Sequence, residues 1–155
     1  MPVGTSFWIA EGMLAGEIEN LNGRDEGVRG YRFPLRNRFL HGHHPLGWIR
    51  ALRLAVDGIP IAQQDIFLVV REQWIGVSQV PTIYDIWWQI NETIHVAVAK
   101  EGGLASGLHA LELVLTVTSL NHTPVLDHRN LYPTLEVPLS ASLQVAAAVN
   151  EGAHF

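Results

Sequence analysis

The sequence predicts an all-β protein with a β-sandwich or jelly-roll-like fold, and three observations support this prediction. Segments that alternate apolar and polar residues recur along the chain, as half-buried strands do. About six to nine such strands follow one another at spacings of about 8 to 15 residues, which is typical of sandwiches and barrels. No window of about 12 residues shows convincing helical periodicity. We therefore expect residues 1–155 to form a single β-sandwich domain, with a frayed tail at residues 150–155.

The N-terminal part contains three segments that can be assigned. Residues 5–11 carry aromatic and β-branched side chains and predict a first strand. Residues 20–30 contain three glycines and four charged residues, which is typical of a loop or a ribbon-like excursion. Residues 31–40 include Pro34, and a proline suits an edge strand or a bulge.

The middle of the chain gives the clearest strand. In residues 48–57, Leu52, Leu54 and Val56 share one face, and the Asp57-Gly58 dipeptide that follows favours a tight turn.

Further strands are expected on either side of a loop. Residues 66–70 (IFLVV) predict a strand that is buried on both faces, and residues 77–85 predict a loop or a short turn. Residues 86–90 and 93–100 are separated by Asn91-Glu92, which predicts a hairpin between them.

The C-terminal part again contains segments in which apolar and polar residues alternate. Residues 101–107 predict a glycine-rich turn, and residues 109–119 predict a strand with Leu111, Leu113, Leu115 and Val117 facing inward. Residues 121–133 read as a polar loop, and residues 139–149 as a further strand.

Composition excludes several classes of function. The chain carries 15 acidic and 10 basic residues, and this net charge of -5 argues against a nucleic-acid partner. It has no cysteine, so disulfides, thiolate metal sites and cysteine nucleophiles are excluded. No signal peptide and no apolar run of about 18 residues is visible, which predicts a soluble cytoplasmic protein.

A loop that carries His41, His43 and His44 is the first candidate for a functional site. Histidine is a common metal ligand, and a His-x-His pair in a jelly roll suggests a cupin-like metal site, with His109 as a possible third ligand. The carboxylate that such a site needs does not follow nearby. The alternative is a loop whose imidazoles form hydrogen bonds with the backbone or with a partner chain.

The adjacent Trp87 and Trp88 are the second candidate. On a strand their side chains point to opposite faces, so one indole is expected in the core and the other at the surface. The surface indole could be covered by a partner or could stack on a sugar or aryl ring. Residues 102–109 (GGLASGLH) read as a hairpin turn rather than a phosphate loop, because no lysine and no helix follows. No serine in a nucleophile elbow is visible, so we expect no self-sufficient active site in this chain.

Several stretches from Leu35 onward resemble a known family. They are LRNRFLHG (35–42), VDG (56–58), TIHVAVAK (93–100) with the tryptophan-containing strand before it, and GGLASGLHALEL (102–113). In their order and spacing they resemble the small β subunit of bacterial C-glycoside deglycosidases.

This resemblance implies an accessory subunit that pairs with a larger α subunit of sugar-isomerase-like barrel fold. The α subunit would hold a divalent metal, typically Mn²⁺, and the main catalytic histidine, so no cofactor and no catalytic residue is expected in this chain. The complex would cleave the carbon–carbon bond between a 3-oxo-glucosyl group and an aromatic aglycone such as a flavonoid. The reaction class is a lyase elimination.

The residues expected at the substrate pocket or the subunit interface come from the two candidate regions. They are Arg38, His41, His43, His44, Trp48, Trp87 and Trp88. Two other functions remain open. A stand-alone cupin-like enzyme would bind a metal through His41, His43 and His109, and a non-catalytic carbohydrate-binding module would bind glycosides without a partner.

Overall fold

The structure is a computed structural model that describes residues 8–22, 27–40, 42–118, 134–146 and 149–152. Among these residues it is almost entirely β, which confirms the predicted fold class. The strands are β1 (Glu17–Asn22), β2 (Val28–Arg36), β3 (His44–Pro45), β4 (Ile49–Val56), β5 (Ile59–Pro60), β6 (Ile66–Val70), β7 (Gln73–Gly76), β8 (Trp87–Trp88), β9 (Thr93–Ala99), β10 (Leu108–Thr118), β11 (Thr134–Val145) and β12 (Val149–Gly152).

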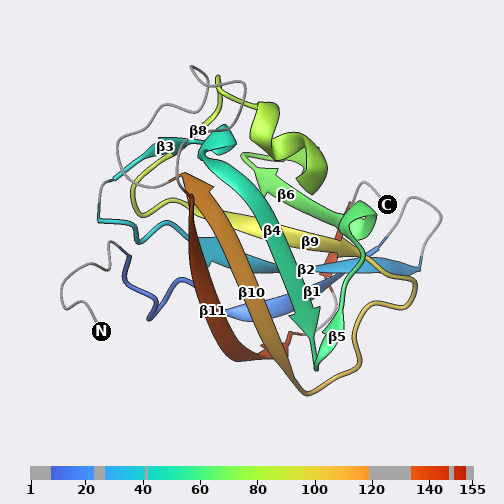
Figure 1. Ribbon diagram of the computed structural model, residues 1–155. Coiled ribbons are helices and arrows are strands. Elements are labelled where there is room, and N and C mark those ends of the chain that lie inside the picture. The colour runs from blue at the N-terminus through green and yellow to red at the C-terminus, as the bar shows by residue number, and fades with distance from the viewer. Residues whose placement is uncertain (1–7, 23–26, 41, 119–133, 147–148, 153–155) are drawn as a thin grey trace.

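Most strands belong to one large curled sheet in the order β5-β4-β10-β11-β1-β2-β9-β6-β7, with β12 also paired to β1. Figure 1 shows β4, β10 and β11 crossing in front of β1, β2 and β9, so the curled sheet forms two layers. The joint between the layers is short and parallel, because β1 pairs with β11 only at Glu17↔Gln144 and Ile18↔Val145. The short pair β3-β8 forms a separate two-stranded sheet.

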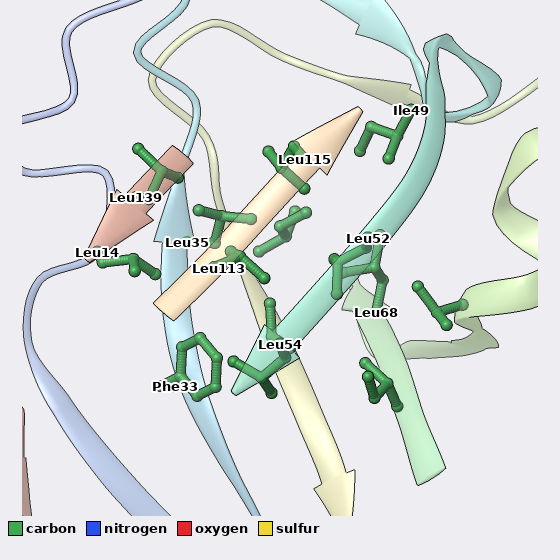
Figure 2. Packing of buried hydrophobic residues seen from close by; sticks show 14 of the residues in the cluster. Leu14, Phe33, Leu35, Ile49, Leu52, Leu54, Leu68, Leu113, Leu115 and Leu139 are labelled. Carbon is green, nitrogen blue, oxygen red and sulfur yellow. The ribbon is translucent and has the colours of Figure 1, made fainter. Parts of the chain in front are cut away.

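The core lies between the two layers. In the front layer, β10 and β4 pair in a register that sets Leu113 opposite Leu54 and Leu115 opposite Leu52. Figure 2 shows Leu54 and Leu113 lying near Phe33 and Leu35 of β2. Each fully buried side chain of this size contributes about 1.5–3 kcal/mol of hydrophobic free energy. The two-residue alternation in the sequence is therefore what defines the inner face of each layer.

The strongest sequence patterns are confirmed. Strands β4, β6, β9 and β10 lie within one or two residues of the predicted ranges. The Asp57-Gly58 turn joins β4 to β5, and both residues have left-handed φ angles of 52° and 80°. The glycine-rich turn between β9 and β10 is also present, with φ angles of 82° at Gly102 and 63° at Gly103.

The N-terminal predictions were partly wrong. Described residues 8–11 form no strand, apart from an isolated bridge between Trp8 and Phe39. Strand β1 begins at Glu17 inside a segment with no predicted element, and it forms a hairpin with β2. Strand β2 is not an edge strand, because it pairs with both β1 and β9. Its pairing with β1 ends at Arg32, so Pro34 lies beyond the β1–β2 ladder.

The predicted hairpin between residues 86–90 and 93–100 is also wrong. Strand β8 covers only Trp87 and Trp88, and it pairs with β3 instead of β9. Asn91 does form a turn, with a φ of 62°, but the chain before it bends toward the histidine-containing loop. The physical reason is a buried amide, Asn37, which is described below.

Three short 3-10 helices lie in described connections between the strands. They are η1 (Leu46–Trp48), η2 (Gln63–Asp65) and η3 (Val77–Thr82), the last in place of the predicted loop or short turn. Among the described residues, no helix is long and apolar enough to cross a membrane. The predicted loop at residues 121–133 lies outside the described residues.

Candidate functional site

Asn37 organises the region that contains the predicted site residues. It follows β2 directly and its side chain is fully buried. The amide Nδ2 donates to the carbonyl oxygens of Gly42 (3.0 Å), Trp88 (3.1 Å) and Gln89 (3.0 Å), and Oδ1 accepts from the backbone N–H of Phe39 at 3.0 Å. These bonds tie the loop that follows β2 to β8 and its exit. Sequence reasoning missed this role, because one asparagine between two arginines has no distinctive pattern.

Backbone hydrogen bonds reinforce the same junction. The N–H of Asn37 donates to the carbonyl of Glu92 at 2.9 Å, and the N–H of Asn91 donates to the carbonyl of Asn37 at 3.0 Å. The indole Nε1 of Trp88 donates to the carbonyl of Glu92 at 3.0 Å. The loop and β8 therefore form one hydrogen-bonded unit.

An aromatic cluster fills the space under this junction. The rings of His44 and Trp48 stack, with centroids 3.8 Å apart and an interplanar angle of 7°. Phe39 contacts Trp48 and Trp88 edge-on, with centroid distances of 4.8 and 5.9 Å. Trp48 and Trp88 are each only 1% exposed. His44, Trp48 and Trp88 thus pack the loop onto the core, and we assign them a structural role rather than direct contact with a ligand.

The outer side of the same unit is exposed. Trp87 is 41% exposed, and the ring of His43 lies against it with centroids 5.3 Å apart at 64°. Leu40 and Ile90 are also exposed, at 60% and 55%. We call the surface made by Leu40, His43, Trp87 and Ile90 the Trp87 face. It lies at the end of the molecule where β3 and β8 pair (Figure 1).

The remaining predicted residues lie elsewhere. Arg38 donates through Nη1 to the carbonyl of Glu11, so it fastens the chain before β1. His41 lies outside the described residues. His109 is at the start of β10, whereas His43 precedes β4, so the two histidines lie at opposite ends of the front layer (Figure 1). The structure does not bring His43 and His109 together, and the alternative metal site built from them therefore has no support.

A pocket of about 390 Å³ opens beside Trp87. Its polar lining consists of Arg71, Gln73, Asp85 and Gln89, and its apolar lining includes Trp87 itself. We call this the Trp87 pocket. Sequence reasoning identified Trp87 but missed the polar residues, because they come from two separate segments, 70–73 and 85–89, which are joined by the hydrogen bond from Arg71 Nη2 to the carbonyl of Trp87.

A second polar contact lies at the far end of β4. His109 Nδ1 is 2.6 Å from Asp57 Oδ2, and its Nε2 is 2.7 Å from the carbonyl oxygen of Ala105. Both neighbours can only accept hydrogen bonds, so the doubly protonated imidazolium satisfies both. The Asp57 carboxylate also accepts from the N–H of Ala110 at 2.8 Å. The pair clamps the β4–β5 turn to the start of β10.

These contacts raise the pKa of His109 and lower the pKa of Asp57. The hydrogen bond to Asp57, and then the one to Ala105, raise the pKa of His109 above its ordinary value of 6.5. The hydrogen bond from His109, and then the one from Ala110, lower the pKa of Asp57 below its ordinary value of 3.8. By contrast, burial lowers the pKa of His95 in β9, and the neighbouring Arg32 adds to this effect.

We expect the clamp to make stability depend on pH. Because its pKa is raised in the folded state, the contribution of His109 is fully present below its unfolded value and is lost as the pH rises through its folded value. The contribution of Asp57 is present above its unfolded value and is lost as the pH falls through its folded value. The clamp is therefore strongest between about pH 4 and 6.5.

An NMR titration of the histidine ring signals checks this, with His95 as the internal control. His109 should titrate above pH 6.5 and His95 below it. In thermal unfolding, His109→Gln should flatten the fall in stability of the wild type above pH 6.5. An unchanged slope in this variant would contradict the clamp.

The described residues do not assemble a metal-binding set. No group of three or more His, Asp and Glu side chains among them could hold a metal ion. What they do assemble is a polar pocket with a half-exposed indole at its edge and an apolar face around it. Fold and site together thus define an all-β chain with an exposed aromatic site at the end where β3 and β8 pair.

Comparison with known proteins identifies the family. The sequence model of the C-glycoside deglycosidase beta subunit family matches residues 12–120, which is more than half of the chain. The chain belongs to this family, and the resemblance seen in its sequence is confirmed. A beta subunit implies a heteromeric partner, so this chain is a subunit of an enzyme complex. A comparison with curated proteins gives no significant match.

Proposed function

We propose that this chain is the accessory subunit of a heteromeric C-glycoside-cleaving lyase. Its partner would be a larger α subunit of sugar-isomerase-like barrel fold that holds a divalent metal, with Mn²⁺ expected, and the catalytic base. The observation that supports this proposal most directly is the family match over residues 12–120. A cytoplasmic location and a role in flavonoid glycoside catabolism belong to the same proposal.

The proposed reaction is an elimination on a 3-oxo-C-glucoside. The ketone at C3 acidifies the proton at C2, and a base removes that proton. The electron pair left at C2 forms a double bond to C1, the C1–aryl bond breaks, and the aryl carbon takes up a proton. A divalent metal on the ketone oxygen would stabilise the negative charge that develops there. The base and the metal belong to the partner chain in this proposal.

This chain would act at the subunit interface. The Trp87 face carries exposed apolar side chains at 41–60% exposure, and tryptophan is enriched where proteins associate. The Asn37 hydrogen bonds hold this face rigid, so little ordering free energy would be spent on binding. We propose that the Trp87 face contacts the α subunit and borders the substrate.

Co-expression with the product of the neighbouring open reading frame tests this function. The two chains should co-purify, and a 3-oxo-C-glucoside should be cleaved only when both are present. Cleavage by this chain alone would contradict the accessory role and favour a stand-alone enzyme.

A pair of variants tests the position of the interface. Ile90→Arg places a charge on the Trp87 face and should reduce co-purification at least about tenfold, because an unpaired charge would be desolvated on binding. Ile59→Arg places the same charge on β5, where the side chain is 66% exposed. It should leave co-purification unchanged. The reverse result would place the interface at the β5 end.

A further inference from the structure

The turn between β6 and β7 has an unusual backbone. Arg71 and Glu72 both adopt left-handed φ angles, 47° and 70°. Residues with side chains rarely adopt this conformation, and a two-residue turn that needs it twice normally uses asparagine or glycine. Such strain persists only where neighbouring contacts hold it, and it gathers at functional sites.

The contacts that hold this turn also build the Trp87 pocket. Arg71 Nη2 donates to the carbonyl of Trp87 at 2.6 Å and to Glu92 Oε1 at 2.8 Å. Glu92 Oε1 also accepts from the backbone N–H of Gln89 at 2.8 Å. The strained turn is thereby fixed to both ends of the segment 87–89, so the pocket wall is rigid before any ligand binds.

The indole of Trp87 is fixed in the same way. Its backbone pairs with Pro45 across the β3–β8 ladder, and the ring of His43 lies against its own. The indole still remains 41% exposed at the edge of the pocket. A rigid, half-exposed indole offers an apolar surface with little entropy to lose on binding.

We propose that the Trp87 pocket binds a pyranose ring, the glycosyl group of a glycoside. The apolar C–H face of the sugar would stack on Trp87. Its hydroxyl groups would donate to the Asp85 carboxylate and exchange hydrogen bonds with the amides of Gln73 and Gln89. A volume of about 390 Å³ is large enough for one such ring.

The lining favours a sugar over other ligands of similar size. A planar aromatic aglycone would be expected to need apolar walls on both faces, whereas four of the lining side chains here are polar. A metal ion would need several oxygen ligands, and Asp85 is the one carboxylate in the lining. Alternating donors and acceptors beside one indole match a polyhydroxylated ring with one apolar face.

The inference rests on the proposed function for the identity of the glycoside, and on the described residues for the site itself. If both hold, this chain contributes a sugar-binding wall at the subunit interface. The metal and the base of the partner would then act on the same substrate.

The test is an NMR titration of the full chain with methyl β-D-glucopyranoside. The indole N–H signal of Trp87 and the side-chain amide signals of Gln73 and Gln89 should shift with one common Kd, of about 1–10 mM for such a small ligand. Trp87→Ala should weaken binding at least about tenfold, and Asp85→Asn about threefold.

Two matched variants serve as controls. Ile59→Ala removes an exposed apolar side chain from β5, away from the Trp87 face, and Gln79→Ala removes an exposed amide from η3. Neither should change the Kd. Phenol at the same concentrations should cause smaller shifts than the glucoside, whereas larger shifts with phenol would overturn the proposal in favour of an aromatic ligand.

The outcomes separate this inference from the proposed function. If the glucoside does not shift the indole N–H signal of Trp87, the sugar site is overturned, even if the two chains co-purify and are active. The same holds if the amide signals of Gln73 and Gln89 still shift with an unchanged Kd in the Trp87→Ala variant. If the isolated chain self-associates, the same variants are measured in the complex. There Trp87→Ala should raise KM for the glycoside more than it lowers kcat, and an unchanged KM would overturn the inference.

Discussion

Replacement of Asn37 by alanine should lower the free energy of unfolding by about 3 kcal/mol. The variant removes a donor to three carbonyl oxygens, of which that of Gln89 keeps the N–H of Glu92, and it removes the acceptor for the N–H of Phe39; Asn37 itself is fully buried. Buried backbone groups left without partners cost about 1–3 kcal/mol each. For a chain of this length the midpoint of thermal unfolding should fall by about 6–12 °C.

Asn37→Asp should be at least as damaging, although it keeps the size and shape of the side chain. A carboxylate cannot donate to the carbonyls of Trp88 and Gln89, and it would set a negative charge against their oxygens. Gln64→Ala is the matched control, because this amide is exposed and should change stability by less than about 0.5 kcal/mol. If Asn37→Asp were as stable as the wild type, the hydrogen-bond assignment would be contradicted.

The Asn37 network also explains which parts of the fold the sequence could predict. In β4 from Leu52 to Val56 and in β10 from Leu111 to Val117, every second residue is buried, so the inner faces of these stretches follow from period two. Strand β8 belongs to a two-residue ladder whose partner is chosen by a buried amide 51 residues away in sequence. Local pattern contains no information about such a contact, and the sequence therefore suggested a hairpin with β9.

Strand β1 was missed for a different physical reason. Its buried residues, Ile18 and Leu21, are three positions apart, which fits neither strict alternation nor the predicted loop. The register of the β1–β2 pair also shifts just after these residues, between Leu21 and Asn22, so no regular alternation continues through the end of the strand. Charged residues around it then gave the segment the composition of a loop.

The candidate site was predictable only in part. The division of Trp87 and Trp88 between surface and core follows from their adjacency on a strand and is confirmed. The polar half of the pocket was not predictable, because Arg71 and Glu72 have side chains that rarely adopt left-handed φ angles. The charged dipeptide Arg71-Glu72 between two apolar strands predicts a turn. It does not predict that the Arg71 side chain donates a hydrogen bond to the carbonyl of Trp87 in β8.

The two neighbouring tryptophans should separate stability from function. Trp88→Ala should lower the free energy of unfolding by about 3–5 kcal/mol, because it empties a site that is 1% exposed and in edge contact with Phe39. Trp87→Ala, one residue earlier, should cost less than about 1 kcal/mol, because its indole is already 41% exposed. Urea unfolding of both variants beside the wild type measures the difference.

A third variant separates the two contributions of Trp88 to stability, the packing of its ring and the hydrogen bond from its Nε1. Trp88→Phe keeps an aromatic ring against Phe39 but loses the hydrogen bond from Nε1 to the carbonyl of Glu92, which is 3.0 Å long. It should cost about 1–2 kcal/mol, less than alanine, because packing is largely retained while the carbonyl of Glu92 loses one of its two donors and keeps the N–H of Asn37. Equal losses for Trp87→Ala and Trp88→Ala would contradict the assignment of one indole to the surface and the other to the core. A stable, folded Trp87→Ala protein is also what allows any loss of glycoside binding to be attributed to the indole rather than to unfolding.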